Sequence, residues 1–183
     1  MRTRGKRPAR RMKPVFIVFC EGETEELYVS MLRQKYRSPI KIIPKIAGCD
    51  ISSHLIERRK REMKIDEHEK LTVFLMYDMD VEATNSKIDA INAEKLLSNP
   101  CVEFWFLLHS AIETKSLSSR RTINELKNCD AVWTNYEKAT LTEQQKKYLW
   151  EQRMNAVENA KKLMDYKNPS STIYRLLEKL EES

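Results

Sequence analysis

Five acidic residues follow two hydrophobic segments of the chain, and their type and spacing could support metal chemistry. The segment VFIVFC is followed directly by EGETE, and LTVFLMY is followed directly by DMD. Crowded carboxylates repel one another at a high cost in a low dielectric, and a hard divalent cation relieves that cost. The sequence therefore predicts a site for Mg²⁺ or Mn²⁺ formed by Glu21, Glu23, Glu25, Asp78 and Asp80.

The spacing within each cluster indicates which acids could act together. Residues two apart on a strand point to the same side, so Asp78 and Asp80 could share one cation. Glu25 lies four residues after Glu21, so these two could face one way where a strand leads into a helix. An acidic first helical turn also favours the helix dipole, and this explains Glu23 and Glu25 without any chemistry. It does not explain Glu21, which stands directly behind six apolar residues.

Glu103 is a third candidate because it lies inside the apolar run from Val102 to Leu108. A charge in such a run must find a partner or reach a surface. It could add a carboxylate to the site, or it could pair with an Arg as a structural ion pair, and both interpretations stay open. A divalent metal held by two acids beside a further Glu suits phosphodiester chemistry, in which the metal stabilises phosphoryl charge and the Glu moves a proton.

The elements that would position these acids alternate between strand and helix at the start of the chain. That order argues for parallel strands joined by right-handed crossovers, and ligands of such sheets bind outside the carboxyl ends of the strands. Pro44 cannot donate to a strand ladder, so its strand should be short or at an edge. The expected elements are strands at 14–20, 40–46 and 71–77 and helices at 23–36 and 51–67.

The rest of the chain is expected to be mostly helical. The segment SNPCVEFWFLLH could be a buried helix or a strand; we favour a helix with Pro100 at its first position. The helix at 85–97 would be capped by Thr84 or Asn85. The expected helices are 85–97, 98–109, 122–128, 140–165 with Met154 facing inward, and a last one that starts at Asn168–Pro169, and residues 114–122 form a polar loop.

These elements together predict an α/β fold, with a mostly parallel central sheet flanked by helices and a helical C-terminal part. With 183 residues, the chain is long enough for one domain with a substantial core. We expect a single domain over 14–183, with its helical extension at about 137–183, and a flexible basic tail over 1–13.

The positive charge of the chain is concentrated in that tail. The whole chain has 33 Lys and Arg against 27 Asp and Glu, and residues 1–13 hold seven of the basic residues and no acid, so the remainder has 26 against 27. Such a tail could hold a nucleic-acid backbone through counterion release, or it could be a solvated terminus that only aids solubility. Its candidate nucleic-acid-binding residues are Arg2, Arg4, Lys6, Arg7, Arg10, Arg11 and Lys13.

Several functional classes find no support in the sequence. The four cysteines are far apart and form no CxxC pair, which argues against a zinc site or a disulfide framework and favours a cytoplasmic protein. No apolar run approaches the ~20 residues that span a bilayer, and the basic start lacks a hydrophobic signal segment. Three glycines in the whole chain leave no room for a Gly-rich phosphate loop.

The motifs that carry the acids resemble a known domain. A Glu-Gly-x-Thr-Glu turn after the first strand, followed by Asp-x-Asp after a later one, resembles the TOPRIM domain of topoisomerases, primases and OLD-type nucleases. The segments SNPCVEFWFLLH and NPSSTIYRLLEKL are similar to the RloB-like family. Two positions depart from the family pattern: Met79 stands where an Arg is usual, and Val102 where a Phe is usual.

The resemblance implies a TOPRIM-like fold and a role in bacterial defence against phage or plasmids. By motif, Glu21, Asp78 and Asp80 would hold Mg²⁺ or Mn²⁺, and Glu25 and Glu103 would join Glu21 as catalytic carboxylates. The implied activity is that of a metal-dependent nuclease on DNA or RNA, with tRNA among the candidate substrates. The implied partners are nucleic acid and a defence-system ATPase or restriction-modification protein, but no membrane, and homo-oligomerisation is left open.

Two other functions are compatible with parts of the sequence. The fold could serve as a non-catalytic module that binds nucleic acid or a partner. A strand followed by DMDVEAT also resembles the aspartate motif of HAD-type phosphotransferases, with Asp78 as nucleophile and Asp80 as acid/base. That interpretation leaves EGETE and Glu103 unexplained, and no Asp-Asp pair follows residue 80 to complete its metal site.

Overall fold

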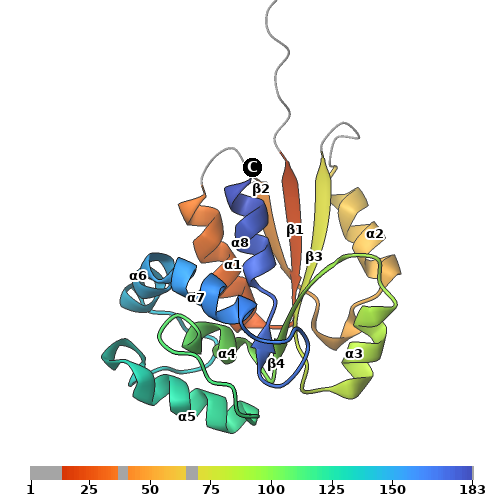
Figure 1. The fold of residues 1–183 in the computed structure, drawn as a ribbon. Helices are drawn as coiled ribbons and strands as arrows, with labels where there is room; N and C mark the ends of the chain where they lie inside the picture. The colour runs from red at the N-terminus through yellow and green to blue at the C-terminus, as the bar shows by residue number, and fades with distance from the viewer. Residues whose placement is uncertain (1–13, 37–40, 65–69, 183) are drawn as a thin grey trace, which may run out of the picture.

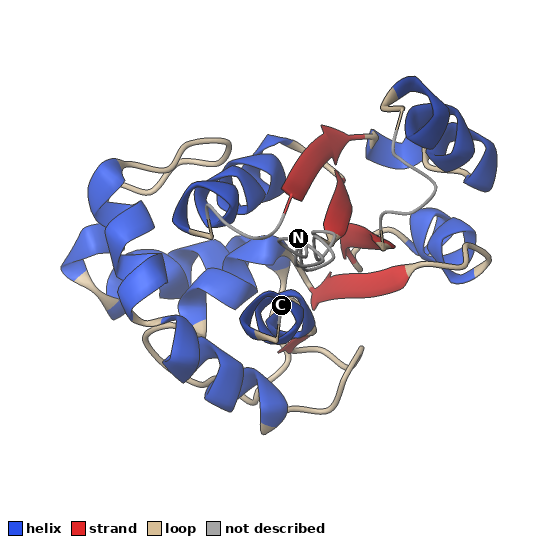
Figure 2. Cartoon of the chain, turned by 90° about the horizontal axis from the view of Figure 1, so that it is seen from above, coloured by secondary structure: helices blue, strands red, loops and turns tan. Residues whose placement is uncertain are grey.

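A five-stranded sheet lies between two groups of helices (Figures 1 and 2). The computed structural model describes residues 14–36, 41–64 and 70–182. The order of the strands is β2-β1-β3-β4-β5; the first four are parallel, and β5 runs antiparallel to β4. The strands are β1 (Val15–Cys20), β2 (Lys41–Ile46), β3 (Leu71–Asp78), β4 (Glu94–Asn99) and β5 (Ser170–Ser171).

The helices pack on the sheet in two unequal layers. One layer contains α2 and α3, and the larger one contains α1 and α4 to α8. The helices are α1 (Glu23–Lys35), α2 (Ser53–Glu62), α3 (Glu82–Asp89), α4 (Val102–Leu107), α5 (Ser119–Cys129), α6 (Glu143–Glu151), α7 (Arg153–Lys161) and α8 (Tyr174–Glu181), with 3-10 turns η1 (Gly48–Asp50) and η2 (Ala131–Trp133).

β1 is buried on both faces, which explains its uninterrupted apolar sequence. Phe16 and Val18 contribute to the larger core, under α1 and the C-terminal helices. Val15, Ile17 and Phe19 contribute to the smaller core under α2 and α3. Because β1 lies between β2 and β3, its carboxyl end is next to that of β3, where DMD follows.

The predicted fold class is confirmed: a mostly parallel central sheet is flanked by helices, and the C-terminal part is helical. The three predicted strands are present within a residue or so of their expected bounds, and the strand with Pro44 is at the edge of the sheet. No helix within the described residues is long and apolar enough to cross a bilayer.

The prediction of a helix over 85–97 was wrong in its second half. The helix α3 starts at Glu82 after its N-cap Val81, rather than after Thr84 or Asn85, and it ends at Asp89. The segment EKLLSN forms β4 instead. Its successive leucines, Leu96 and Leu97, are buried in the two opposite cores, as expected for a strand whose side chains alternate between its two faces.

Other helices also differ from their predicted boundaries. The predicted helix over 140–165 is two helices, α6 and α7, separated at Gln152, and Met154 is half exposed rather than inward. After Asn168–Pro169 the chain first forms β5 and then α8. Helix 98–109 shortens to α4, whose N-cap is Cys101, so Pro100 precedes the helix rather than starting it. The predicted helix over 51–67 is shorter as well, because α2 covers only Ser53–Glu62.

Candidate metal and catalytic site

The two acidic clusters meet where β1 and β3 end side by side. Glu21 follows β1 directly, and its Oε2 accepts a hydrogen bond of 2.8 Å from the main-chain N–H of Asp78, the last residue of β3. Glu21 also donates its own N–H to the Met76 carbonyl at 3.0 Å. Burial, together with the charge of Asp80, raises the pKa of the Glu21 carboxyl, against the hydrogen bond from Asp78 and the charge of Lys138, which lower it.

Asp78 has a strongly raised pKa and a buried oxygen without a partner among the described residues. Burial raises the pKa of its carboxyl well above the usual 3.8, and the charges of Glu25, Glu21, Glu103 and Asp80 raise it further. Its Oδ1 is buried and has no hydrogen-bond partner among the described residues. A buried carboxylate oxygen without a partner is costly, so this atom is a good position for a cation or a proton.

Glu25 is both an acid of the first turn of α1, where it favours the helix dipole, and a buried acid of the candidate site. It lies in the first turn of α1, where its Oε2 accepts a hydrogen bond of 3.2 Å from the N–H of Gly22. It is also only 5% exposed, and burial followed by the charges of Glu21 and Glu103 raises the pKa of its carboxyl to about 7. A group with such a pKa can exchange a proton near neutral pH.

Glu103 is fully buried on α4, and its partner is a lysine rather than the arginine that the sequence suggested. The hydroxyl of Tyr136 donates a hydrogen bond of 3.0 Å to its Oε1, and the ammonium of Lys138 lies 3.8 Å from the same atom. Its Oε2 is buried without a hydrogen-bond partner among the described residues. Because its charge raises the pKa of both Asp78 and Glu25, Glu103 lies within the site as well as in an ion pair.

Asp80 and Glu23 lie farther out. β3 ends at Asp78, so Asp80 belongs to the bend that follows, where its exposed carboxylate accepts a hydrogen bond of 3.4 Å from Ser119 at the start of α5. Its charge still raises the pKa of Glu21 and Asp78. Glu23 is exposed in the first turn of α1, which fits a favourable interaction with the helix dipole.

The donor atoms of the site suit a hard cation, but the side chains are not arranged to coordinate one. Carboxylate oxygens are the ligands that Mg²⁺ and Mn²⁺ prefer, and Asp78 brings a buried oxygen without a partner. Across 14–36, 41–64 and 70–182, however, no three His, Cys, Asp or Glu side chains are placed to hold one metal ion. Glu21, Asp78 and Asp80 would therefore have to rotate about their side-chain bonds to hold one together.

Two residues of the site were missed in the sequence: Tyr136 and Lys138, from the segment between η2 and α6. This segment is fastened to α1 by the Ala139 N–H, which donates a hydrogen bond of 3.0 Å to Thr24 Oγ1. Neither residue belongs to a recognisable motif, and both lie more than 30 residues from the nearest acid of the site. The seven basic residues of the predicted tail lie outside the described residues.

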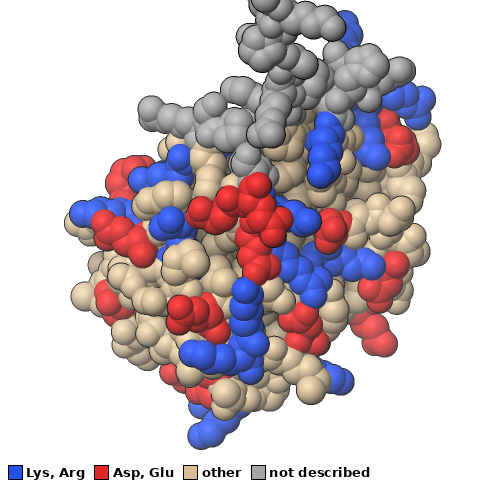
Figure 3. Space-filling view, turned by 45° about the horizontal axis from the view of Figure 1, so that its top comes forward, with Lys and Arg blue, Asp and Glu red and all other residues tan. Residues whose placement is uncertain are grey.

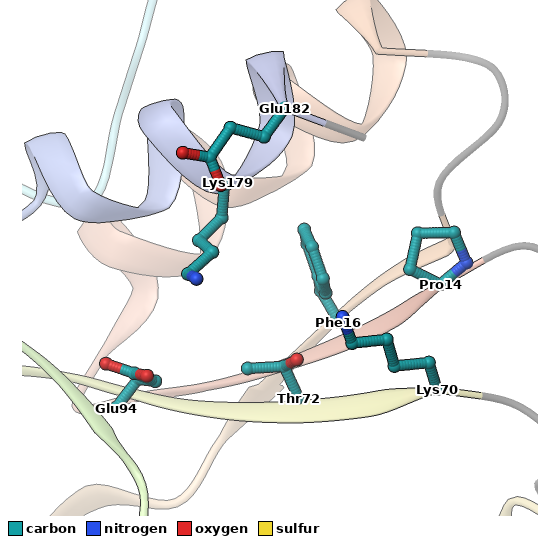
Figure 4. Close-up of a pocket in the computed structure, with 7 residues that line it drawn as sticks. All are labelled: Pro14, Phe16, Lys70, Thr72, Glu94, Lys179 and Glu182. Carbon is teal, nitrogen blue, oxygen red and sulfur yellow. The ribbon is translucent and has the colours of Figure 1, made fainter.

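A separate hollow lies at the opposite end of the sheet, where β1 and β3 begin (Figure 4). It contains none of the site acids. Figure 3 brings this end toward the viewer, and Lys and Arg side chains lie among Asp and Glu side chains on the face that it shows. The hollow is lined by Pro14, Phe16, Lys70, Thr72, Glu94, Lys179 and Glu182.

Comparison with known protein families identifies the family of the chain. The model of the family described as RloB-like protein matches residues 16–180, which is nearly the whole chain. The chain belongs to the RloB-like family. No curated protein and no solved structure matches this RloB-like chain. The matched region includes every acid of the site, from Glu21 through Asp78 and Asp80 to Glu103.

Proposed function

We propose that this RloB-like protein is a divalent-metal-dependent nuclease that hydrolyses phosphodiester bonds of DNA or RNA. The observation that carries the proposal is the convergence of Glu21 and Asp78 at adjacent strand ends, where a 2.8 Å hydrogen bond joins them. Glu25 and Glu103 are buried close enough to raise the pKa of the Asp78 carboxyl. Carboxylates gathered in this way around a buried oxygen without a partner favour a cation.

The residues divide into two roles in this proposal. Glu21, Asp78 and Asp80 would hold Mg²⁺ or Mn²⁺, and the bound ion would supply charge stabilisation for the phosphoryl oxygens and lower the pKa of a water. Glu25, with a pKa of about 7, would take up or release a proton at neutral pH. Tyr136 would hold Glu103 in place through its 3.0 Å hydrogen bond.

We extend the proposal to a role in bacterial defence against phage or plasmids, in the cytoplasm and with nucleic acid as the substrate. Its support is membership of the RloB-like family and the TOPRIM-like motifs EGETE and DMD. A restriction-modification protein or a defence-system ATPase is the kind of partner that would fit this role.

A non-catalytic binding module is the second candidate. It is favoured by one observation, which is that no three acidic side chains among the described residues are placed to hold a metal. The HAD-type alternative is weaker, because it leaves EGETE and Glu103 unexplained and no Asp-Asp pair follows residue 80 to complete its metal site.

A cleavage assay with isosteric variants tests the proposal. The full chain should cleave single- or double-stranded DNA, RNA or tRNA in Mg²⁺ or Mn²⁺ and not in EDTA. Asp78→Asn and Glu21→Gln should each lower the rate at least about a hundredfold while the circular dichroism spectrum stays unchanged. Glu151→Gln is the matched control, because Glu151 is an exposed acid of α6 that pairs with Lys147.

Each alternative has its own outcome in the same assay. A cleavage rate of Asp78→Asn equal to that of the wild type would overturn the assignment of the site. Hydrolysis of small phosphate esters with a covalent adduct on Asp78 would establish the HAD-type chemistry. Tight nucleic-acid binding without cleavage in any metal would establish the binding module.

A further inference from the structure

A lysine reaches the acidic site from a turn that is distant in sequence. The ammonium of Lys138 lies 3.8 Å from Glu103 Oε1, and the side chain is 56% exposed. Its charge lowers the pKa of Glu21, which places it close to that acid too. Lys138 therefore lies between the buried carboxylates and the solvent from which a substrate would approach.

The turn that carries Lys138 is fastened on both sides of this residue. Before it, Tyr136 is buried against Phe106 and Trp133 and donates its hydroxyl hydrogen bond to Glu103. After it, Ala139 adopts a φ of +57°, a left-handed conformation that non-glycine residues rarely take. The N–H of Ala139 is held by Thr24 at 3.0 Å. A strained residue held in this way is typical of functional positions, where surrounding contacts maintain it.

The ammonium of Lys138 keeps its hydrogen-bond donors available. The distance of 3.8 Å to Glu103 is longer than a hydrogen bond, and no hydrogen bond of this ammonium is found within the described part of the chain. Burial would lower the pKa of Lys138, but the neighbouring acids, with Glu103 first, outweigh burial and raise this pKa above its usual 10.5. The group is thus a permanent cation with three N–H donors and partial exposure.

An acidic centre that acts on nucleic acid faces a physical difficulty, because it repels the phosphates that it must bind. Met79, between the two aspartates, offers no charge to offset this repulsion. We propose that Lys138 binds a non-bridging oxygen of a substrate phosphate at the acidic site. This inference rests on the proposed nuclease function and adds a phosphate-binding residue to it.

Binding measurements without turnover test the inference. Anisotropy of a labelled single-stranded oligonucleotide, measured in EDTA and in Ca²⁺ over a range of salt concentrations, gives the affinity and its salt dependence. Removal of one phosphate-binding cation should make the negative slope of log K against log salt less steep by about 0.7. It should also reduce the affinity at about 0.1 M salt roughly fivefold. We expect both changes in Lys138→Met and a return toward the wild-type values in Lys138→Arg.

Lys147→Met is the matched control, because Lys147 is an exposed lysine of α6 that pairs with Glu151. It should leave both the affinity and the slope unchanged. Lys138→Met in a Glu103→Gln background removes the buried negative charge together with its partner, so this double variant leaves no unpaired buried charge at Glu103. It should still bind the oligonucleotide more weakly than Glu103→Gln alone.

The outcomes separate this inference from the proposed function. If the wild type binds and cleaves, and Lys138→Met has the same affinity and slope, the lysine only neutralises Glu103 and the inference is overturned. A lower melting temperature of Lys138→Met with unchanged binding would overturn it in the same way. If the wild type neither binds nor cleaves any nucleic acid, the proposed function fails and this inference with it.

Discussion

At the scale of single residues, the buried carboxylates make the stability of the protein depend on pH. The pKa of Glu25 is raised from its usual 4.5 to about 7 in the folded chain, because burial and neighbouring acids oppose its ionisation. The contribution of such a carboxyl to the free energy of unfolding is fully present below pH 4.5, where the group is protonated in both the folded and the unfolded chain. This stability is lost as the pH rises through about 7.

We therefore expect the free energy of unfolding, measured by urea in EDTA, to be lower at about pH 8 than at about pH 5. Glu25 alone should contribute on the order of 3 kcal/mol to this difference. Glu25→Gln cannot ionise, so its stability should change less between the two pH values than that of the wild type. Glu151→Gln, on the surface, should keep the wild-type dependence. An identical pH dependence in Glu25→Gln would show that this acid does not titrate in the range.

Sequence alone was sufficient to predict that two acids of the candidate site lie side by side, for a physical reason. Glu21 and Asp78 each follow an apolar strand directly, and adjacent parallel strands bring their ends together. Lys138 was not predictable, because its position depends on a turn fastened through Thr24 and Tyr136. Glu103 was recognised as anomalous, but only the fold shows that it lies beside Tyr136 and Lys138.

At the scale of elements, the edge of β4 that faces away from β3 is hydrogen-bonded by a threonine side chain as well as by the short strand β5. β5 has only two residues, and just beyond it Thr172 is fully buried beside β4. The Thr172 hydroxyl accepts a hydrogen bond of 2.8 Å from the Leu97 N–H and donates one of 3.2 Å to the Lys95 carbonyl. One side chain thus satisfies two main-chain groups of β4.

Thr172→Val keeps the shape of this residue and removes both hydrogen bonds. The buried N–H of Leu97 would lose the hydroxyl as its acceptor, so we expect the free energy of unfolding to fall by about 1–3 kcal/mol. Chemical denaturation measures the change, and Thr114→Val, on an exposed loop, is the control. A destabilisation no larger than in the control would show that water or a local shift satisfies Leu97.

Elements were predictable where burial gave a simple pattern. β1 and β3 are continuous apolar runs because helices cover both of their faces. β4 was mistaken for helix because only its two leucines are apolar, and Glu94 and Lys95 suit a helix by propensity. The break at Gln152 between α6 and α7 carries no Gly or Pro that would mark it in the sequence.

At the scale of the whole molecule, the predicted basic tail joins the fold at the end opposite to the acids. Pro14 precedes β1 and Glu21 follows it, and six residues of strand span about 20 Å. A nucleic acid in contact with both regions would therefore extend along the molecule. Thirteen residues of extended chain reach at most about 45 Å, so the tail is long enough for such contacts.

Deleting residues 1–13 should weaken nucleic-acid binding and reduce its salt dependence. Every phosphate that the tail no longer neutralises makes the negative slope of log K against log salt less steep by about 0.7–0.9. The seven basic residues of the tail set the upper limit on the number of phosphates lost. The rate of single-turnover cleavage at saturating protein should stay the same, because the acids are untouched. A salt titration of affinity measures this effect, and an unchanged slope would mean that the tail serves solubility only.

The hollow lined by Pro14 and Glu182 has a practical consequence for handling the protein. Both ends of the described structure lie on one side, near the start of β1 (Figure 1), whereas Glu21 and Asp78 stand at the opposite ends of β1 and β3. A fluorophore or a surface linker attached after α8 would therefore start from the end of the molecule that is opposite to these acids. Single molecules immobilised in this way would present the acidic end to substrate in the bulk solution.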